Sequence, residues 1–373
     1  MAGQGRDDHE VKGVAGPRHG PRGGSGNPKT EAPDGGSRTP ICTPVAMGWW
    51  WWARDARCVP KPIIAAVDPL REDVAPAALG LLLARLTAAP LVLAAAYRID
   101  IYVDSSYPEY ASASRRDAAQ AMSRVADLAA RAPGGPVAVT TTVTPAVGSG
   151  TRALHDLAER EQASLVAIGS SGRGRVGRVL PGAVTDRLLH GAPCPVAVAP
   201  VGFSFEDAAA GPRVIGVAFT DTPDGRAALS TACMLAVRAH GFVRLLTVPE
   251  PPHPMMTATL DAMALEDVRS ARDAEAEAAL RRGLDSVSPG RSAGGEILSG
   301  DPSDALAAAS ADFGLLVCGS RGYGPMRTLV VGGTSHALVR KAVCPVLVVP
   351  PSSTADQTGR ASDTRTGSRP PGA

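Results

Sequence analysis

Aromatic residues are scarce in this chain, where Phe, Trp and Tyr together make up 4% of 373 residues. The hydrophobic fraction of 44% must therefore come mostly from small aliphatic side chains such as Ala, Val and Leu. The length exceeds the ~100–200 residues of a usual single domain, so two domains are expected.

A strong charge of either sign is also missing. Lys and Arg total 38 against 36 Asp and Glu, which gives a formal net charge of +2. This balance does not suggest a nucleic-acid or membrane partner. The most hydrophobic stretch, Ala75 to Tyr97, is interrupted by Arg85 and Pro90, so neither part is long enough to cross a bilayer. The polar first forty residues show no secretory pattern, and we expect a cytoplasmic protein.

Recognisable catalytic and metal-binding patterns are missing as well. The six cysteines show no C-x-x-C spacing, and we expect reduced thiols, with Cys194 and Cys344 buried as small hydrophobic residues. The seven histidines form no metal pattern, and structural roles are expected for His155, His190 and His336. No nucleophile elbow, H-E-x-x-H or kinase motif occurs. We therefore predict no catalytic residue and no metal ligand, and favour a binding protein over an enzyme.

A duplication organises what is present. Ser164 to Pro200 reads as a strand, a glycine-rich loop, a helix and a second strand, and Gly314 to Pro350 repeats this order. The same offset of 150 residues relates the glycines and the Cys-Pro pair of the two copies. A fixed-period repeat predicts two similar α/β domains.

The shared pattern is G-x2-G-x9-G, in which an apolar strand feeds a glycine loop and then a helix. Glycines let backbone N–H groups approach a phosphate, and the start of a helix adds free donors. The alternative is that these glycines serve only turn geometry or close packing of helix on strand. Gly172 to Gly177 also matches two better-known patterns, but it lacks the later acidic residue of a dinucleotide site and the Lys-Ser/Thr of a P-loop.

Two segments resemble the universal stress protein family, namely Gly169-x2-Gly172-x9-Gly182 and Gly319-x2-Gly322-x9-Gly332, each followed by a helix and a Cys-Pro-Val strand. The resemblance runs in tandem from about Pro62 to Pro350. It implies an α/β fold of two doubly wound domains, each a five-stranded parallel sheet with helices on both faces, of the adenine nucleotide alpha hydrolase-like type. In one branch of the family it also implies ATP or another adenine nucleotide, with or without Mg²⁺, bound by this loop.

The chain departs from the binding form of that family at two equivalent positions. The last glycine of the motif is followed there by Ser or Thr, whereas Ala183 and Gly333 stand here, with Thr334 nearby. The resemblance also places an Asp at the end of the first strand, where Asp68 lies in the first copy and Ala218 in the second. Asp68 can reach the ligand crevice or simply complete a turn. If one site binds, the retained Asp68 favours the first.

The candidate nucleotide-binding residues are Asp68, Gly169, Gly172, Arg173, Gly182, Ala183, Gly319, Gly322, Gly332, Gly333 and Thr334. Arg173 can pair with phosphate or remain a solvated loop charge.

We divide the chain into an extension (1–61), a first domain (62–201), a linker (202–212), a second domain (213–350) and a tail (351–373). The extension and tail are polar and read as disordered. Trp49 to Trp52, which contain every tryptophan, are either a docking peg or part of a segment outside the natural protein.

Expected strands cover 62–67, 91–96, 137–143 and 196–199 in the first domain, and 214–219, 243–248 and 296–298 in the second. Expected helices cover 76–87, 109–131 and 151–161, then 224–240 and 260–284, with another from Ser303. The resemblance implies that the last strands, Val196 to Ala199 and Val346 to Val349, associate within one chain as a pseudo-dimer, and a homodimer of chains stays open. The leading hypothesis is a stress-response protein that binds an adenine nucleotide and acts by binding. The alternatives are a scaffold without nucleotide and a weak nucleotide hydrolase.

Overall fold

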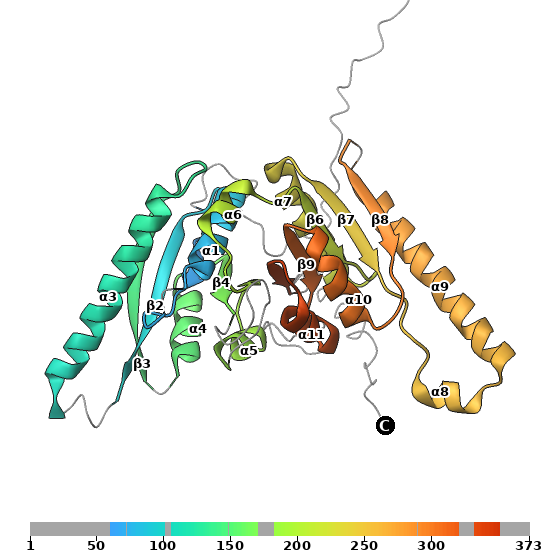
Figure 1. The fold of residues 1–373 in the computed structure, drawn as a ribbon, viewed down its shortest axis with the longest axis horizontal. Coiled ribbons are helices and arrows are strands. Elements are labelled where there is room, and N and C mark those ends of the chain that lie inside the picture. Colours follow the sequence, from blue (N-terminus) through green and yellow to red (C-terminus); the bar gives the residue numbers. More distant parts are fainter. Residues whose placement is uncertain are drawn as a thin grey trace, which may run out of the picture. The chain divides into compact units, whose positions relative to one another are not determined.

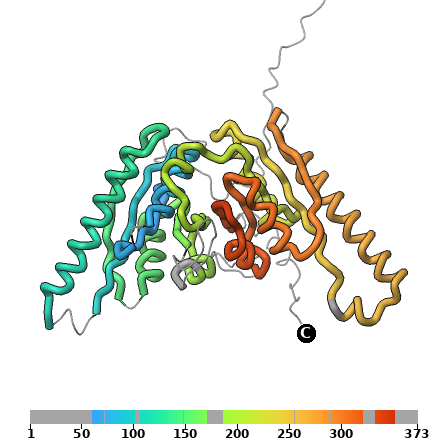
Figure 2. The backbone as a smooth tube through the Cα atoms, in the orientation of Figure 1, coloured from blue at the N-terminus to red at the C-terminus, as the bar shows by residue number. Residues whose placement is uncertain are grey.

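The computed structural model describes residues 60–71, 73–100, 106–147, 149–170, 183–288, 290–320 and 332–350. Within them the chain alternates strands and helices twice over (Figure 1). The predicted α/β class with two doubly wound repeats is confirmed. The tube in Figure 2 follows the first repeat from blue to green and the second from yellow to red.

In the described residues of the first half, nine elements follow the order that the repeat predicts. They are β1 (Ile63–Ala66), α1 (Ala75–Thr87), β2 (Leu91–Ile99), α3 (Pro108–Arg131), β3 (Val139–Val147), α4 (Gly150–Arg160), β4 (Leu165–Gly169), α5 (Ala183–Leu189) and β5 (Val196–Ala199).

The second half repeats that order after a short helix. Its elements are α6 (Phe205–Ala210), β6 (Val214–Ala218), α7 (Pro223–Ala239), β7 (Phe242–Thr247), α8 (Pro254–Thr259), α9 (Ala262–Asp285), β8 (Ala293–Ile297), α10 (Pro302–Ala309), a 3₁₀ turn (Ser310–Asp312), β9 (Leu315–Gly319), α11 (Gly333–Lys341) and β10 (Val346–Val349).

All ten strands form one sheet in the order β3-β2-β1-β4-β5-β10-β9-β6-β7-β8. Each half contributes five parallel strands, and both halves have the same internal order. The halves join where β5 pairs antiparallel with β10, and Ala197 lies opposite Leu347 in that ladder. One edge strand of each repeat, β5 or β10, is therefore covered by the other repeat, which removes the pairing hazard of an open strand at that edge.

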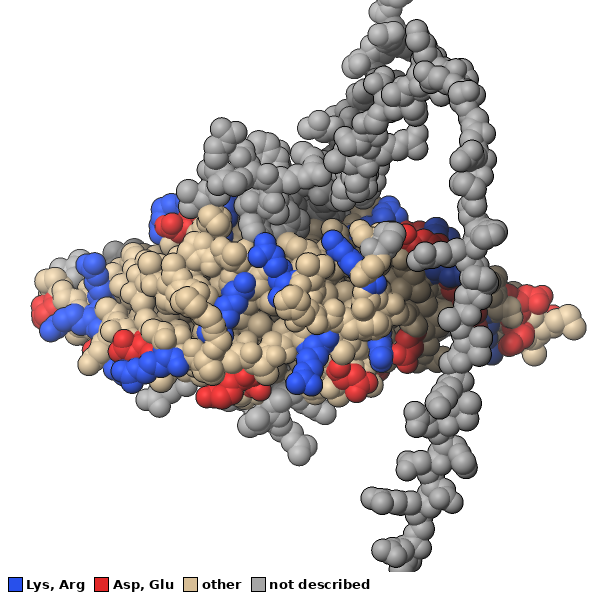
Figure 3. Space-filling model, turned by 90° about the horizontal axis from the view of Figure 1, so that it is seen from above, with Lys and Arg blue, Asp and Glu red and all other residues tan. Residues whose placement is uncertain are grey.

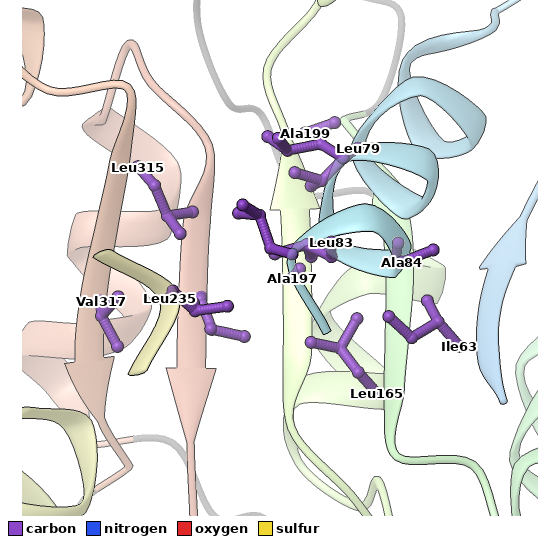
Figure 4. Close-up of a cluster of buried hydrophobic side chains, with 14 of the residues drawn as sticks. Ile63, Leu79, Leu83, Ala84, Leu165, Ala197, Ala199, Leu235, Leu315 and Val317 are labelled. Carbon is purple, nitrogen blue, oxygen red and sulfur yellow. The ribbon is translucent and has the colours of Figure 1, made fainter. Parts of the chain in front are cut away.

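Helices cover both faces of the sheet, as parallel strands require. One buried cluster includes side chains of α1, α3, α6, α7 and α9, and the other includes side chains of α4, α5, α10 and α11. Figure 4 shows part of the first cluster, in which Leu79 and Leu83 of α1 lie near Ala197 and Ala199 of β5. Small residues allow this close approach: a Cβ atom on Gly80 would come within 2.9 Å of the Ala65 side chain.

Some elements differ from the expected ranges. The strand predicted at 137–143 lies at Val139–Val147, because it continues to pair with β2 as far as Ile99. The strand predicted at 296–298 begins earlier, at Ala293. Helix α8 was not predicted, because its first residue closes a proline-rich segment that reads as a loop.

The predicted linker contains α6, whose N-terminus is fixed by a capping box between Ser204 and Asp207. The side chains of Phe205 and Ala208 are buried in the first cluster, so this segment contributes to the core. The domain boundaries themselves stay a prediction.

Two surface expectations can be compared with the described residues. On the face drawn in Figure 3, basic and acidic side chains are interspersed, in keeping with the near-neutral net charge. Every helix that the structure describes is too short or too polar to cross a bilayer.

Candidate functional site

Each half of the sheet has one switch point, a place where the order of the strands reverses. Strand β1 lies between β2 and β4, and β6 lies between β7 and β9, so the chain changes direction in the sheet beside β1 and β6. In an open parallel sheet, ligands bind beyond the carboxyl ends of the strands at such a switch point. In the second half β6 ends at Ala218, which lies opposite Cys318, and β9 ends one residue later at Gly319.

A cavity of about 70 Å³ occupies the switch point of the second half. Strand ends, the start of α7 and the helices α10 and α11 line it. The lining residues are Ala218, Phe219, Thr220, Thr222, Asp224, Val248, Glu250, Pro302, Leu306, Cys318, Gly319, Thr334, Ser335 and Leu338. Two of these lining residues, Gly319 and Thr334, belong to the predicted site, and Ser335 follows Thr334 directly.

The start of α11 supplies one wall of this cavity. Gly332 is the N-cap in an extended conformation and makes no side-chain cap, and Gly333 follows as the first helical residue. The first N–H groups of a helix have no acceptor within the helix and carry partial positive charge. The Ser335 hydroxyl donates to the Gly319 carbonyl at 2.8 Å, which ties this helix start to the end of β9. The structure thus brings Gly319, Gly332, Gly333 and Thr334 together.

Ser320 follows directly after β9 and is fully buried, and its Oγ atom has no hydrogen-bond partner within the part of the chain that the structure describes. Its N–H donates to the Val349 carbonyl, so it extends the strand ladder by one residue. A Cβ on Gly319 would face Asp224 of α7. Side chains alternate along a strand, so the Ser320 side chain lies on the opposite face, which α11 covers. Sequence reasoning missed Ser320.

The thiol of Cys318 shares that face and is inert. Burial raises its pKa to about 12, although a hydrogen bond with Ser335 acts in the other direction. Burial likewise raises the pKa of Cys194 and of Cys344 to about 12. These two residues are buried, as the sequence predicted.

The first glycine of each motif has a packing role. A Cβ on Gly169 would lie 2.9 Å from Cγ of Pro76 and 3.2 Å from a carboxylate oxygen of Asp73. A Cβ on Gly319 would lie 2.7 Å from Cβ of Asp224 and 2.9 Å from its carbonyl group. Both glycines therefore allow the first helix of each half to approach the strand. By contrast, a Cβ on Gly333 would meet nothing within 4 Å.

Asp68 completes a turn at the end of β1. Its Oδ1 atom accepts from the Leu70 N–H at 3.0 Å, and its Oδ2 atom lies 3.3 Å from Nε of Arg71, with both side chains about half exposed. The turn function that the sequence left open is thus present.

The strand registers also correct the expected counterpart of Asp68. Ile63 pairs with Leu165 and Ile215 pairs with Leu315, so counting forward along both strands makes Thr220 equivalent to Asp68. The expectation that Ala218 holds this position was wrong by two residues, because the first strands are related by an offset of 152 rather than 150. Thr220 lines the cavity, and its hydroxyl lies 3.1 Å from that of Thr222.

Two carboxylates near the cavity of the second half have lowered pKa values, which keeps them ionised. Asp221 accepts from Nε of Arg282 at 2.6 Å and from Arg226, and these contacts, led by the Arg282 hydrogen bond, lower its pKa despite partial burial. The Ser303 hydroxyl at 2.6 Å and the first N–H groups of α10 lower the pKa of Asp301.

Gly172, Arg173, Gly182 and Gly322 lie outside the described residues. Ala183 begins α5.

A second hollow lies on the first half, between α4 and α5 rather than at the switch point. Its rim includes His155, Asp156 and Glu159, whose ligand atoms lie within 4.8 Å of one another. These three residues were not predicted as a group, although Glu159 is at i+4 from His155 and at i+3 from Asp156, spacings at which helical side chains meet. His155 Nε2 also lies 2.8 Å from the Gly191 carbonyl, which supports the structural role expected for this residue.

Most of the residues that line the cavity of the second half were not predicted. Thr220 and Thr222 lie in the loop after β6, Asp224 lies in the first turn of α7, and Glu250 lies in the loop after β7. These residues carry no sequence motif. The available signal was topological: residues just beyond the ends of strands beside a switch point converge.

The two five-stranded parallel halves of the sheet, each with its switch point and glycine-ended fourth strand, define an α/β protein of the doubly wound class. The profile of the universal stress protein family matches residues 60–200 and 212–350, and the chain belongs to this family in its tandem form.

Similar proteins support this assignment. A universal stress protein of Mycobacterium tuberculosis is 28% identical over 200 residues, which cover 50% of this chain and 62% of that protein. The chain thus matches less than two thirds of the length of that relative. A second from the same species is 35% identical over 103 residues, covering 28% of this chain and 32% of the relative.

Solved structures show the same fold. A universal stress protein of Archaeoglobus fulgidus has a TM-score of 0.50 at 20% identity, with 78% of this chain and 97% of that one covered. A functionally unknown protein of Pseudomonas aeruginosa has a TM-score of 0.52 at 14% identity, with 78% and 93% covered.

Proposed function

We propose that this universal stress protein binds an adenine nucleotide at the carboxyl edge of its sheet and acts by binding rather than by turnover. The observation that carries the proposal is the cavity at the second switch point, which the start of α11 and the end of β9 line together. The position of the cavity, the glycine motif and the family membership all favour a nucleotide ligand, and each rests on a different property of the chain.

The residues present fit such a ligand in chemical type. At one end, Thr220, Asp224 and Glu250 offer oxygen atoms that can accept hydrogen bonds from ribose hydroxyls or from a base amino group. At the other end, the N-terminal turn of α11 favours an anion. An amphipathic pocket of this kind would orient a nucleotide with its phosphate toward α11.

The size of the cavity sets a condition on this proposal. Its volume of about 70 Å³ is well below the ~300 Å³ of a small ligand pocket. A nucleotide therefore fits only if the crevice widens on binding. The same fact, with Ala183 and Gly333 in place of the expected hydroxyl residues, favours the second candidate, a scaffold of this family without nucleotide.

We also propose that domains 62–201 and 213–350 form an intrachain pseudo-dimer. In its support, Ala197 and Leu347, which are 150 residues apart as the repeat requires, face each other in the β5–β10 ladder. Two equivalent positions meet in this way when the halves are related by an approximate twofold axis.

The decisive experiment is isothermal titration of the purified chain with ATP, ADP and AMP, with and without Mg²⁺. Binding of at least one nucleotide, abolished or strongly weakened when Gly172→Val and Gly322→Val are combined, is the expected result. No heat with any nucleotide and no nucleotide in the ultraviolet spectrum of the purified protein would favour the scaffold. Release of phosphate or AMP that the same substitutions abolish would indicate a hydrolase.

A further inference from the structure

We infer that the hollow between α4 and α5 of the first half (Figure 1) is the site of a divalent transition-metal cation of the Zn²⁺ class, bound by His155, Asp156 and Glu159. The inference does not depend on nucleotide binding, because this hollow is separate from the cavity of the second half. It departs from the sequence-based expectation that the chain holds no metal ligand.

The first observation is the set of ligand atoms. One atom from each of the three side chains lies within 4.8 Å of the others. Nδ1 of His155 is 3.7 Å from Oδ1 of Asp156 and 4.0 Å from Oε2 of Glu159. Zn²⁺ binds imidazole nitrogen and carboxylate oxygen at about 2.0–2.2 Å, which places two ligand atoms of a tetrahedral site ~3.3–3.6 Å apart. Movements of a few tenths of an ångström in the exposed carboxylates would therefore close the site.

The orientation of the His155 ring is the second observation. Its Nε2 atom lies 2.8 Å from the carbonyl oxygen of Gly191, in the turn after α5. A carbonyl oxygen only accepts hydrogen bonds, so Nε2 carries the hydrogen and Nδ1 of the neutral ring holds the lone pair. A metal-binding histidine usually donates its second N–H in this way, which fixes the ring. The lone pair of His155 thus points to the side of Asp156 and Glu159.

A simple ion pair explains these contacts less well. If Nδ1 of His155 were protonated, it would donate to one of the carboxylates. Its separations of 3.7 and 4.0 Å from Asp156 and Glu159 exceed the ~3.2 Å limit of an N–H···O hydrogen bond. A cation between the three atoms contacts all of them at once. The hollow, about 410 Å³ in volume, leaves room for the water that completes a Zn²⁺ site with three protein ligands.

Two arginines also line the hollow, and both make their contacts with other atoms. Nε of Arg152 lies 4.0 Å from Oδ2 of Asp156, whereas Oδ1 of that carboxylate faces His155. The Arg152 side chain is 84% exposed, and such pairs are weak. Nη1 of Arg187 lies 3.5 Å from Oγ of Ser149, next to the start of α4. A cation at the three ligands therefore does not have to displace either of these contacts.

The second half shows which side chains this helix needs for packing. Counted from their first residues, α4 and its counterpart α10 both bury a leucine at the fifth position, Leu154 and Leu306. By the same count, the positions of the three proposed ligands hold alanine in the second half, namely Ala307, Ala308 and Ala311. The counterpart helix packs on the sheet without these polar groups, so packing does not account for them. One metal site per chain follows.

The test is equilibrium dialysis of the full chain against Zn²⁺. The parent protein carries Cys42→Ser and Cys58→Ser, because these cysteines lie outside the described residues and would compete for the metal. We expect one Zn²⁺ per chain at this site. Loss of an outer partner already costs a metal site about 10–100-fold in affinity, so Asp156→Asn and Glu159→Gln should each weaken binding about tenfold or more. The matched control is Glu161→Gln, which makes the same change at the end of the same helix and should leave the affinity unchanged.

Thermal unfolding supplies a second readout. A ligand that binds only the folded state raises the melting temperature, so Zn²⁺ should raise that of the parent and of Glu161→Gln more than that of the two ligand variants. With a chelator present, all four proteins should melt at similar temperatures, because the side chains of Asp156 and Glu159 are 56% and 59% exposed.

Three results would overturn the inference. The parent binds no Zn²⁺; or it binds Zn²⁺ with the affinity of both ligand variants, which would mean an adventitious ion only; or Glu161→Gln weakens binding as much as Glu159→Gln, which would mean a response to net charge. If one ligand variant does not fold, the other decides. Each of these results leaves the proposed function standing, since nucleotide binding is measured separately.

Discussion

Nε2 of His336 lies 3.2 Å from Oδ1 of Asp186, a residue 150 positions earlier in the chain. The same offset relates the glycines of the repeat, so His336 and Asp186 occupy equivalent positions of the two halves and contact each other. The ring of His190 packs edge-on against His336 with centroids 5.7 Å apart. The contact joins α5 to α11 and extends the β5–β10 junction to the helices.

This contact should couple the two halves weakly. Its side chains are 29% and 37% exposed, and pairs of this kind contribute about 0.2–1 kcal/mol. A double-mutant cycle with His336→Gln and Asp186→Asn, measured by urea unfolding, should give a coupling energy in that range. A coupling energy of zero at low salt would mean that the contact does not stabilise the junction.

Gly225 should tolerate no side chain. A Cβ there would overlap the Thr220 carbonyl oxygen, which belongs to the backbone just before α7 and cannot move aside as a flexible side chain can. Gly225→Ala should lower the free energy of unfolding by about 2 kcal/mol or more. The matched control is Gly333→Ala, which meets open space in a helix and should be neutral or stabilise by up to about 1 kcal/mol. Equal effects would show that the close approach at Gly225 is not required.

The first glycines of the two motifs should differ in their tolerance of alanine. The added methyl of Gly319→Ala meets backbone atoms of Asp224, whereas that of Gly169→Ala meets mainly the ring of Pro76. A backbone segment yields less than the end of a side chain. Gly319→Ala should therefore cost about 1–3 kcal/mol of stability, and Gly169→Ala should cost less. The ranking can be read from denaturant midpoints, and a reversed order would refute it.

Asp221 should stabilise the protein in a pH-dependent way. Its pKa is lowered in the folded state, so its contribution is full above the unfolded value of about 3.9 and is lost as the pH falls through the folded value. Asp221→Asn should cost about 1 kcal/mol near neutral pH, since both arginine partners are half exposed. The stability difference between variant and wild type should shrink below pH 4. A difference that stays constant down to pH 2 would contradict this account.

The buried thiols should react only when the fold opens. Burial raises the pKa of Cys194, Cys318 and Cys344 to about 12, so almost no thiolate forms at pH 8. Burial also raises the pKa of Cys233, the fourth thiol that remains in a Cys42→Ser, Cys58→Ser background. A thiol reagent should therefore label this double variant in its native state at the rate of unfolding. Rapid labelling of this double variant would show that one of the remaining thiols is accessible.

The repeat made the architecture readable from the chain alone. A strand, a glycine loop, a helix and a Cys-Pro-Val strand occur twice, separated by the same offset. This repeat predicted the α/β class, the family and the burial of Cys194 and Cys344. Such features depend on local order along the chain and on apolar runs, which a sequence displays directly.

Tertiary structure decided which residues meet. Thr220 is the counterpart of Asp68 because hydrogen-bond register, rather than the repeat offset, aligns the first strands. Gly169 and Gly319 make room for a helix, although the motif suggested phosphate contact. Burial and partners arise from side chains far apart in sequence, so no local pattern could reveal them.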